Sequence, residues 1–144
     1  MKFNVDFLKK LGNTYDEACK PICTKYGITK TGFDILMFLA NNPEYRTASE
    51  VVDIRMIKAN LVSVNVDKLV KEGYLKRKPI VGDRRKTELL ITEKTSSLVA
   101  DGKEFQKNML NKLMKNTTEE QRNVFAQVLE IMNENLNTME EKQI

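Results

Sequence analysis

Hydrophobic side chains recur with the period of an α-helix along most of this chain, which predicts separate helices. Over residues 3–26, apolar positions fall near i, i+4 and i+7 spacings, and this pattern predicts one helix that Pro21 kinks near its end. Gly27 is expected to stop that helix, and Thr29 is expected to cap a second helix over 31–41. The chain is therefore expected to begin with two helices.

Two further helices are predicted next. Thr47 or Ser49 can cap a short helix over 48–55, and after a brief break another helix is expected over 58–72, closed by Gly73. In the second of these helices, the apolar stripe that is spaced to pack on the core consists of Val62, Val66 and Leu69. Polar and basic side chains occupy the opposite stripe, which is therefore free to meet a partner.

The hydrophobic period changes after this helix. Residues 74–91 are rich in β-forming side chains on both sides of a Gly-Asp turn signal, which predicts a two-stranded hairpin. The helical period returns over 92–114, and Thr117 with Glu120 three residues later matches a capping box that opens a last helix. Four helices, a hairpin and two more helices indicate a mainly α fold, a winged helix-turn-helix with a two-stranded β-hairpin wing.

The composition agrees with a helical chain and argues against several functions. The 144 residues are 41% hydrophobic and 31% charged, and we expect one folding unit with regions at 1–30, 31–92 and 93–144. No histidine is present, which removes the usual general base and the commonest metal ligand, so that no catalytic residue, metal site or cofactor is expected. No segment matches a membrane span or a signal peptide, and a cytoplasmic protein is expected.

Positive charge is concentrated in one segment. The formal net charge is +4, but the residues from Arg55 to Lys86 include ten basic and three acidic side chains, so that this segment carries +7 and the rest of the chain carries −3. Such an asymmetry is typical of a protein with one face that meets a polyanion.

The helix over 58–72 is interpreted as the element that enters the major groove of DNA. Asn60 and Ser63 can hydrogen-bond base edges, Val64 can contact a thymine methyl, and the lysines suit phosphates. The residues assigned to DNA in this helix are Lys58, Asn60, Ser63, Val64, Lys68 and Lys71. The alternative interpretation is an amphipathic helix whose polar side is simply solvated.

The hairpin adds a second basic element. Three consecutive cations, Arg84, Arg85 and Lys86, follow the turn, where they would repel one another in folding but would suit the narrow and negative minor groove. Arg77 on the first strand is also assigned to DNA, and Asp83 can orient Arg85 through a charge-assisted hydrogen bond. A charged surface hairpin without a nucleic-acid partner is the alternative.

The segment LVKEGYLKRKPIVGDRRKTELLIT, residues 69–92, resembles the wing of the MarR family of bacterial regulators. The matching residues are Gly73, Arg77, Asp83, Arg85, Leu89, Ile91 and Thr92. Residues 27–29 and 113–121 are also similar to that family. The turn at 54–58 lacks the glycine that is usual in the family, and Val64 stands where a basic residue is common, so the bases that are read stay open.

The resemblance implies that 58–72 is the recognition helix, that Arg85 enters the minor groove with Asp83 positioning it, and that the terminal helices form a dimer interface. The terminal helices also carry more large apolar residues than a short winged core can cover, which independently favours a second copy of the chain as partner. The residues assigned to dimerisation are Phe3, Phe7, Leu8, Leu11, Phe125, Val128, Leu129, Met132 and Leu136.

The sulfur-containing residues leave two functions open. Cys19 and Cys23 are interpreted as buried structural thiols, although an oxidant-sensing branch of the family uses a thiol in the same helix, closer to the N-terminus. The seven methionines are interpreted as core and interface residues, although a crevice rich in Met and Phe could accept a small apolar or aromatic effector.

Together these features predict a sequence-specific regulator of transcription that binds double-stranded DNA. The expected form is a homodimer on a pseudo-palindromic operator, most often as a ligand- or stress-responsive repressor. Two alternatives stay open, a winged-helix adaptor that binds an acidic protein and a sequence-independent DNA-packaging protein. They differ from the regulator in the preference for one DNA sequence over random DNA.

Overall fold

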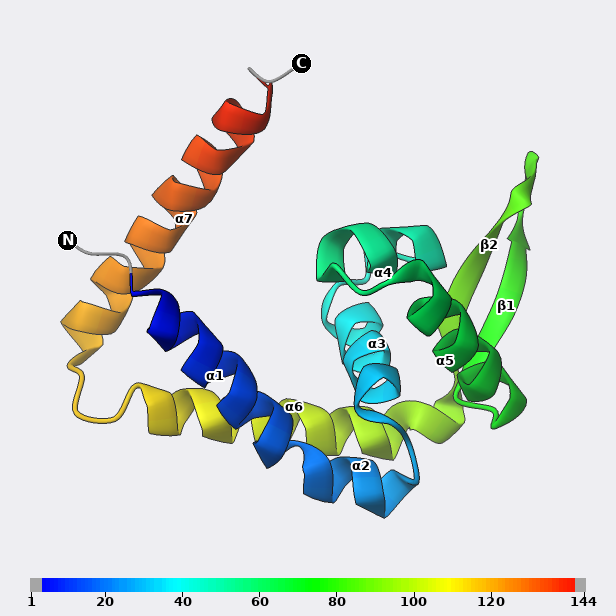
Figure 1. Ribbon diagram of the computed structural model, residues 1–144, viewed down its shortest axis with the longest axis horizontal. Helices are drawn as coiled ribbons and strands as arrows, with labels where there is room; N and C mark the ends of the chain where they lie inside the picture. Colours follow the sequence, from blue (N-terminus) through cyan, green and yellow to red (C-terminus); the bar gives the residue numbers. More distant parts are fainter. Residues whose placement is uncertain (1–3, 142–144) are drawn as a thin grey trace. The chain divides into compact units, whose positions relative to one another are not determined.

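The computed structural model describes residues 4–141 and shows a mainly α chain with one antiparallel hairpin (Figure 1). The chain divides into two compact units, one that ends at Lys107 and one that begins at Asn108, and each is described by itself. The elements are α1 (Val5–Ala18), α2 (Lys20–Tyr26), α3 (Lys30–Asn41), α4 (Ala48–Arg55), α5 (Ala59–Lys71), β1 (Leu75–Ile80), β2 (Asp83–Ile91), a 3₁₀ turn (Glu93–Thr95), α6 (Ser96–Leu113) and α7 (Glu119–Glu141). The fold predicted from the hydrophobic pattern, a winged helix-turn-helix, is confirmed.

The N-terminal helix is broken two residues earlier than predicted. Helix α1 ends at Ala18, Cys19 links it to α2, and Pro21 lies in the first turn of α2. Proline fits this position because the first turn of a helix has amide groups without an intrahelical partner, whereas inside a helix its ring clashes with an earlier carbonyl. Gly27 ends α2 in the left-handed region with φ 63°, and the Thr29 side chain caps α3, both as predicted.

The helix-turn-helix consists of α4 and α5. Helix α4 has the predicted bounds, and Thr47 caps it through a reciprocal capping box with Glu50. The turn that follows places Met56 in the left-handed region with φ 53°, a conformation that glycine adopts more easily than a residue with a Cβ atom. The Met56 side chain is 89% exposed, so it gains little from packing in return.

The core of the first unit is formed mainly by α3. Phe33, Ile35 and Leu36 are completely buried, and each such side chain contributes roughly 1.5–3 kcal/mol through the removal of apolar surface from water. The apolar stripe of α5 lies against this core, as predicted, and Leu75 at the start of β1 joins it. The residues on the opposite side of α5 are therefore held by a well-packed base.

Strands β1 and β2 pair antiparallel, from Leu75 opposite Ile91 to Pro79 opposite Thr87, with an irregularity at Ile80 near the turn. Gly82 lies in this turn with φ 91°, which is the left-handed region that favours glycine. The edge of β2 is also covered, because the Leu89 amide donates to the Arg46 carbonyl at 2.7 Å and Thr47 forms a bridge with Glu88. The segment before α4 therefore fixes the hairpin to the helices.

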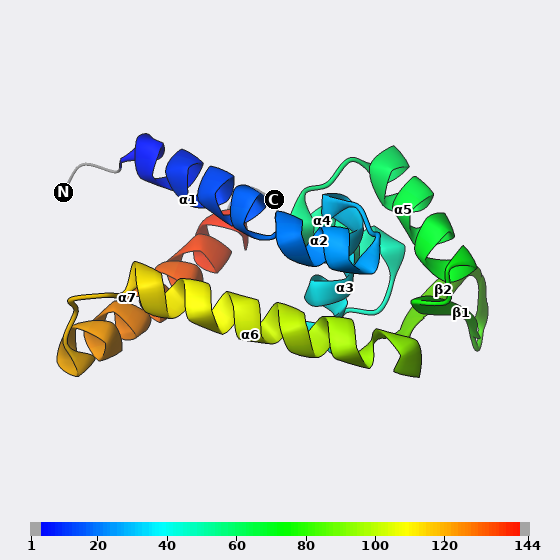
Figure 2. The same cartoon turned by 90° about the horizontal axis from the view of Figure 1, so that it is seen from below.

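The part of α6 that belongs to the first unit lies beside α1 and α2 (Figure 2) and packs against α3. The Gln106 side chain donates to the Tyr15 hydroxyl at 2.9 Å, and the Asn41 side chain donates to Gln106 at 2.9 Å. The approach to α3 is close at Gly102, because a Cβ atom there would collide with Met37. This glycine allows the two helices to pack at short range.

The second unit contains the end of α6 and all of α7. The capping box at the start of α7 is formed by Thr118 and Gln121, which exchange hydrogen bonds at 2.9 and 3.2 Å, so the predicted pairing of Thr117 with Glu120 is wrong. The Thr117 hydroxyl instead donates to the Met114 carbonyl at 2.6 Å. Among the helices that the structure describes, none has both the length and the apolar character needed to cross a bilayer.

Candidate nucleic-acid interface

The outward face of α5 carries the predicted contact residues. Val64 is 65% exposed, and the neighbouring polar side chains are exposed on the same side of the helix. The exposed members of the predicted set are Asn60, Ser63, Val64, Lys68 and Lys71, with Lys58 at the N-cap position. The structure therefore brings these residues together on a solvent-facing row, while their contacts with DNA stay a prediction.

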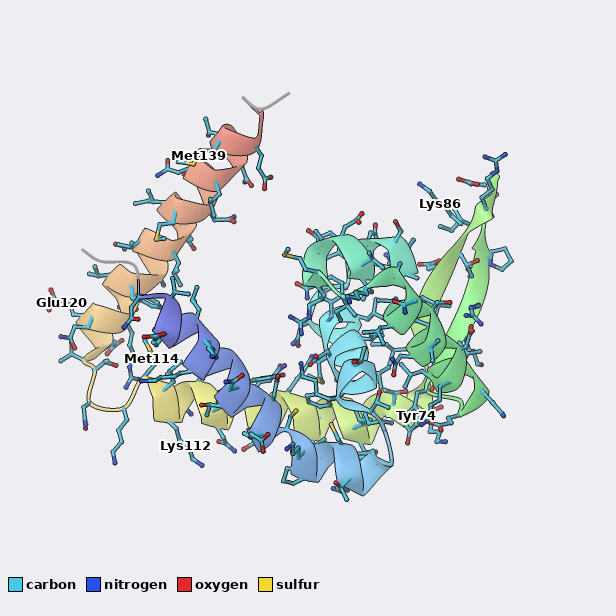
Figure 3. All side chains as sticks on the ribbon, viewed as in Figure 1. Tyr74, Lys86, Lys112, Met114, Glu120 and Met139 are labelled. Carbon is cyan, nitrogen blue, oxygen red and sulfur yellow. The ribbon has the colours of Figure 1, made fainter. Side chains whose placement is uncertain are left out.

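The wing carries a second group of basic side chains. Arg85 and Lys86 are exposed, and Figure 3 shows Lys86 projecting near the tip of the hairpin, at the end away from Tyr74. The predicted Arg84 side chain, like Phe3 of the predicted dimerisation set, lies outside the described part of the structure. Strand β2 therefore presents at least two cations for a negatively charged partner.

Asp83 contacts Arg85, but at the main chain. One carboxylate oxygen of Asp83 accepts the backbone amide of Arg85 at 2.9 Å, the pattern of an Asx turn. The hydrogen bond expected between Asp83 and the Arg85 guanidinium is thus replaced by one that shapes the turn itself. The assignment of Asp83 as a wing-orienting residue stays a prediction, now with a backbone contact as its basis.

A groove of about 580 Å³ lies between α4, α5 and the hairpin. Its apolar lining comes from both helices and from β2, and its polar lining includes Ser63 of α5 together with Arg77, Arg85 and Lys86 of the wing. The apolar lining residues are Ala48, Val52, Ala59, Val62, Val66 and Leu89. Predicted DNA contacts from α5 and from the hairpin therefore border one concave surface.

Arg77 has a partner that the sequence analysis missed. Its guanidinium forms an ion pair with the carboxylate of Asp67, on the outward face of α5. The two residues are ten positions apart, and the chain reverses between them at Gly73, which lies at φ 83°. The helical period places Asp67 on the outward row of α5. That position is the feature of the sequence from which a contact with a basic residue of the hairpin could have been predicted.

Glu50 links the N-terminus of α4 to the chain before it. Its carboxylate accepts the amides of Arg46 and Thr47 at 2.6 and 2.8 Å, and these two hydrogen bonds lower the pKa of Glu50. The Arg46 side chain in turn forms an ion pair with Glu88 of β2 at 2.9 Å. The capping box therefore lies where the hairpin joins the helix-turn-helix.

Replacement of Glu50 by alanine is expected to destabilise the fold by about 1 kcal/mol at pH 7, the usual scale for a helix cap. Because the pKa of Glu50 is lowered in the folded state, its contribution is fully present above the unfolded-state pKa and is lost as the pH falls through the folded-state pKa. Urea denaturation at several pH values between 7 and 3 measures the free energy of unfolding of both proteins. The difference between the variant and wild type should become smaller as the pH falls. Glu44→Ala, at an exposed position nearby, is the control, and an equal loss there would contradict this account.

The two cysteines are buried, as predicted for structural thiols. Cys19 is completely buried, its thiol donates to the Asp16 carbonyl at 3.2 Å, and burial is the main cause that raises its pKa to about 11. Burial also raises the pKa of Cys23. Both thiols are therefore protonated at neutral pH, which disfavours reaction with oxidants. The effector crevice expected among Met and Phe residues stays a prediction.

Comparisons with known proteins match this arrangement to one family. A sequence model of the MarR family matches residues 26–86, which include α3, α4, α5 and β1. The HTH-type transcriptional regulator PecS of Dickeya dadantii is 30% identical over 94 residues, which is 64% of this chain and 57% of PecS. The chain thus spans little more than half of the length of this relative.

Solved structures extend the similarity to nearly the whole chain. A MarR transcriptional regulator from Methanosarcina mazei is 28% identical, with a TM-score of 0.72 and 94% of each chain covered. A putative MarR family transcriptional regulator from Listeria monocytogenes, solved in complex with a 26mer DNA, shares the fold at a TM-score of 0.81, with 20% identity over 94% of this chain and 90% of that chain. The chain is thus similar to the MarR family of transcriptional regulators, in sequence over residues 26–86 and in fold over nearly its whole length.

Proposed function

We propose that this protein is a sequence-specific transcriptional regulator that binds double-stranded DNA as a homodimer on a pseudo-palindromic operator. The observation that carries the proposal is the groove between α4, α5 and the hairpin, because Ser63 of the recognition helix and Arg85 and Lys86 of the wing border the same hollow. A helix and a basic hairpin that share one side of a molecule suit neighbouring grooves of a B-form duplex.

Charge supports DNA as the partner. The residues from Arg55 to Lys86 carry +7, and the outward row of α5 ends with Lys68 and Lys71 near the C-terminus of the helix. These lysines suit phosphates, while Asn60, Ser63 and Val64 are exposed and suit contacts with base edges. The proposal therefore assigns phosphate contacts to the helix end and to the wing, and sequence reading to the first turns of α5.

Exposed apolar residues support a second copy of the chain as the other partner. In α1, Phe7 and Leu8 are each about half exposed, and in α7 five predicted interface residues are 40–55% exposed. Those five are Phe125, Val128, Leu129, Met132 and Leu136. An apolar row of this length on a helix is costly in water and is stabilised by a like surface related by a two-fold axis.

The proposal has two further parts. The first is repression, because a dimer bound at a promoter excludes polymerase, and the second is a response to a small apolar or aromatic effector. Both come from the family resemblance stated above. A transcription assay on a template with the selected duplex placed at the promoter tests the first, and added compounds that lower affinity for that duplex test the second. Activation, or affinity that no such compound changes, would remove these parts and leave DNA binding intact.

The decisive experiment is selection of a duplex from a random-sequence pool by the wild-type protein, followed by titration of the selected and random duplexes at several salt concentrations. A regulator should prefer the selected duplex by about 10³ or more. A packaging protein should bind both equally with strong salt dependence, and an adaptor should bind neither. Either of these results would overturn the proposal.

Replacement of Arg85 by alanine tests the wing directly. The variant is expected to lose about 1–3 kcal/mol of affinity for the selected duplex, because a side chain placed to enter the minor groove is removed, while the fold is unchanged. Fluorescence anisotropy measures the affinity, and circular dichroism checks the fold. Lys103→Ala, which removes an exposed cation from α6, is the matched control and should bind as wild type. Equal affinity of Arg85→Ala and wild type would show that the wing is wrongly assigned.

A further inference from the structure

Asp67 is the only acidic residue of α5, and it lies in the outward row of that helix. It follows Ser63 by four positions and Val64 by three, so all three lie on one side of the helix, and its side chain is 61% exposed. On the proposed function, this row faces DNA. An isolated carboxylate there would repel phosphates, so its presence needs a physical reason.

The reason lies in the ion pair with Arg77. The guanidinium of Arg77 reaches Asp67 from β1, where Arg77 stands opposite Leu89 in the strand register, and Arg77 also lines the groove that Arg85 and Lys86 border. The Arg77 side chain is 42% exposed, so without Asp67 it would be a mobile cation at the base of the wing. Asp67 neutralises that cation and fixes where it stands.

A second ion pair holds the other strand of the hairpin. Arg46, just before α4, pairs with Glu88 of β2 at 2.9 Å, and Leu89 of the same strand bonds to the Arg46 carbonyl. The Asp67–Arg77 pair attaches β1 to α5. The hairpin is therefore attached to the helix-turn-helix at both edges, and Asp67 provides the attachment that involves the recognition helix.

We propose that Asp67 is a positioning residue that keeps Arg77 away from phosphates and, by fixing the wing against α5, raises the sequence specificity of DNA binding. A free arginine at this place would bind the phosphate backbone of any duplex, which adds affinity that carries no sequence information. The carboxylate of Asp67 occupies Arg77 and so removes this phosphate contact. A larger share of the affinity then comes from the residues that reach base edges. This inference rests on the proposed function.

The pair is exposed, and exposed ion pairs contribute little to folding. The effect of Asp67 should therefore appear in DNA binding and hardly in stability. Release of one arginine to a phosphate is expected to make the slope of log K against log salt steeper by about 0.9, and to raise affinity for random duplex on the order of tenfold at low salt. On the selected duplex the gain should be smaller, because the specific complex also loses the fixed position of the wing, and the preference for the selected duplex should therefore fall.

The test compares Asp67→Asn with wild type on the selected duplex and on a random duplex, each over a range of salt. Asp67→Glu retains the carboxylate and should behave as wild type. Glu93→Gln makes the same change of net charge at an exposed position beyond the hairpin, and its slopes should be unchanged. In an Arg77→Ala background, Asp67→Asn should change the slope by less than it does in the wild-type background, because the cation that it releases is absent.

Three outcomes would overturn the inference. The first is an Asp67→Asn slope equal to that of Glu93→Gln, the second is a proportional change of affinity for both duplexes, and the third is an effect of the same size in the Arg77→Ala background. Melting curves of each variant separate a loss of fold from a change in binding. If wild type shows no preference for its selected duplex, the proposed function fails instead, and the two failures are thereby distinguished.

Discussion

Aspartates in place of Phe125 and Leu129 are expected to leave the protein monomeric at micromolar concentration and to lower its affinity for the selected duplex by a factor on the order of 10³ or more. Both side chains lie on α7 and are about half exposed, at 53% and 47%. In a dimer, Phe125 and Leu129 would each bury apolar surface. Because both copies carry the substitutions, the two-fold interface would contain the new negative charges from both sides. Sedimentation velocity measures the oligomeric state, and anisotropy measures the affinity.

Gln127→Asp is the matched control for this variant. It adds a carboxylate to the same helix, and at 100° per residue it lies well away from the row that contains Phe125 and Leu129. This control should remain dimeric and bind as wild type. A dimer that survives both aspartates would show that α7 does not form the interface, and the apolar row would then need another occupant.

The second large effect is expected inside the first unit, where Asp34 is a buried acid. Its side chain is 4% exposed, and one carboxylate oxygen forms ion pairs with Lys30 at 2.5 Å and with Arg55 at 3.3 Å. The other oxygen is buried, and no hydrogen-bond partner for it is present among the described residues. The two cations therefore provide most of the compensation for this buried charge.

Replacement of both Lys30 and Arg55 by methionine should lower the free energy of unfolding by about 3–5 kcal/mol, because the buried side chain of Asp34 would lose both of its ion-pair partners. Addition of Asp34→Leu to that variant should restore much of the loss, since apolar residues can replace a buried ionic group. Urea denaturation at one fixed protein concentration measures both variants. A loss below about 1 kcal/mol in the double variant, or a triple variant that is weaker still, would contradict this account.

Much of the architecture could be predicted because short-range patterns determine it. The capping box of Thr47 and Glu50, the stop at Gly27 and the apolar stripe of α5 each depend on residues within one or two helical turns. The turn at Gly82 likewise depends on one residue that adopts a positive φ. Local chemistry of this kind can be read from neighbouring residues, and the structure agrees with it.

The predictions that failed involve choices that local patterns leave open. Thr117 and Thr118 are followed three positions later by Glu120 and Gln121, so two capping boxes fit the sequence, and the structure forms the second. The kink was assigned to Pro21 itself, whereas the chain accommodates the proline by starting a new helix before it. Periodicity predicts which side of a helix a residue occupies, but not how the chain enters or leaves that helix.

The partner of Arg77 could not be predicted for a related reason. Its contact with Asp67 depends on how sharply the chain turns at Gly73 and on how the hairpin leans on α5, and neither follows from the hydrophobic pattern. Basic residues in a segment with a charge of +7 all look alike as candidates for phosphate contacts. Arg77, Arg85 and Lys86 are all exposed, and the structure distinguishes Arg77 by its ion pair with Asp67.

The attachment of the hairpin at both of its edges limits how this molecule can respond to different DNA sites. Since β1 pairs with α5 and the backbone of β2 bonds to the segment before α4, we expect the helix and the wing to move together. A site that is slightly too wide or too narrow within one half cannot then be accommodated by a swing of the wing alone. The protein can then adapt to a different site only through the distance between the two halves of an operator. Sequence variation among natural sites should therefore be greatest between the two halves.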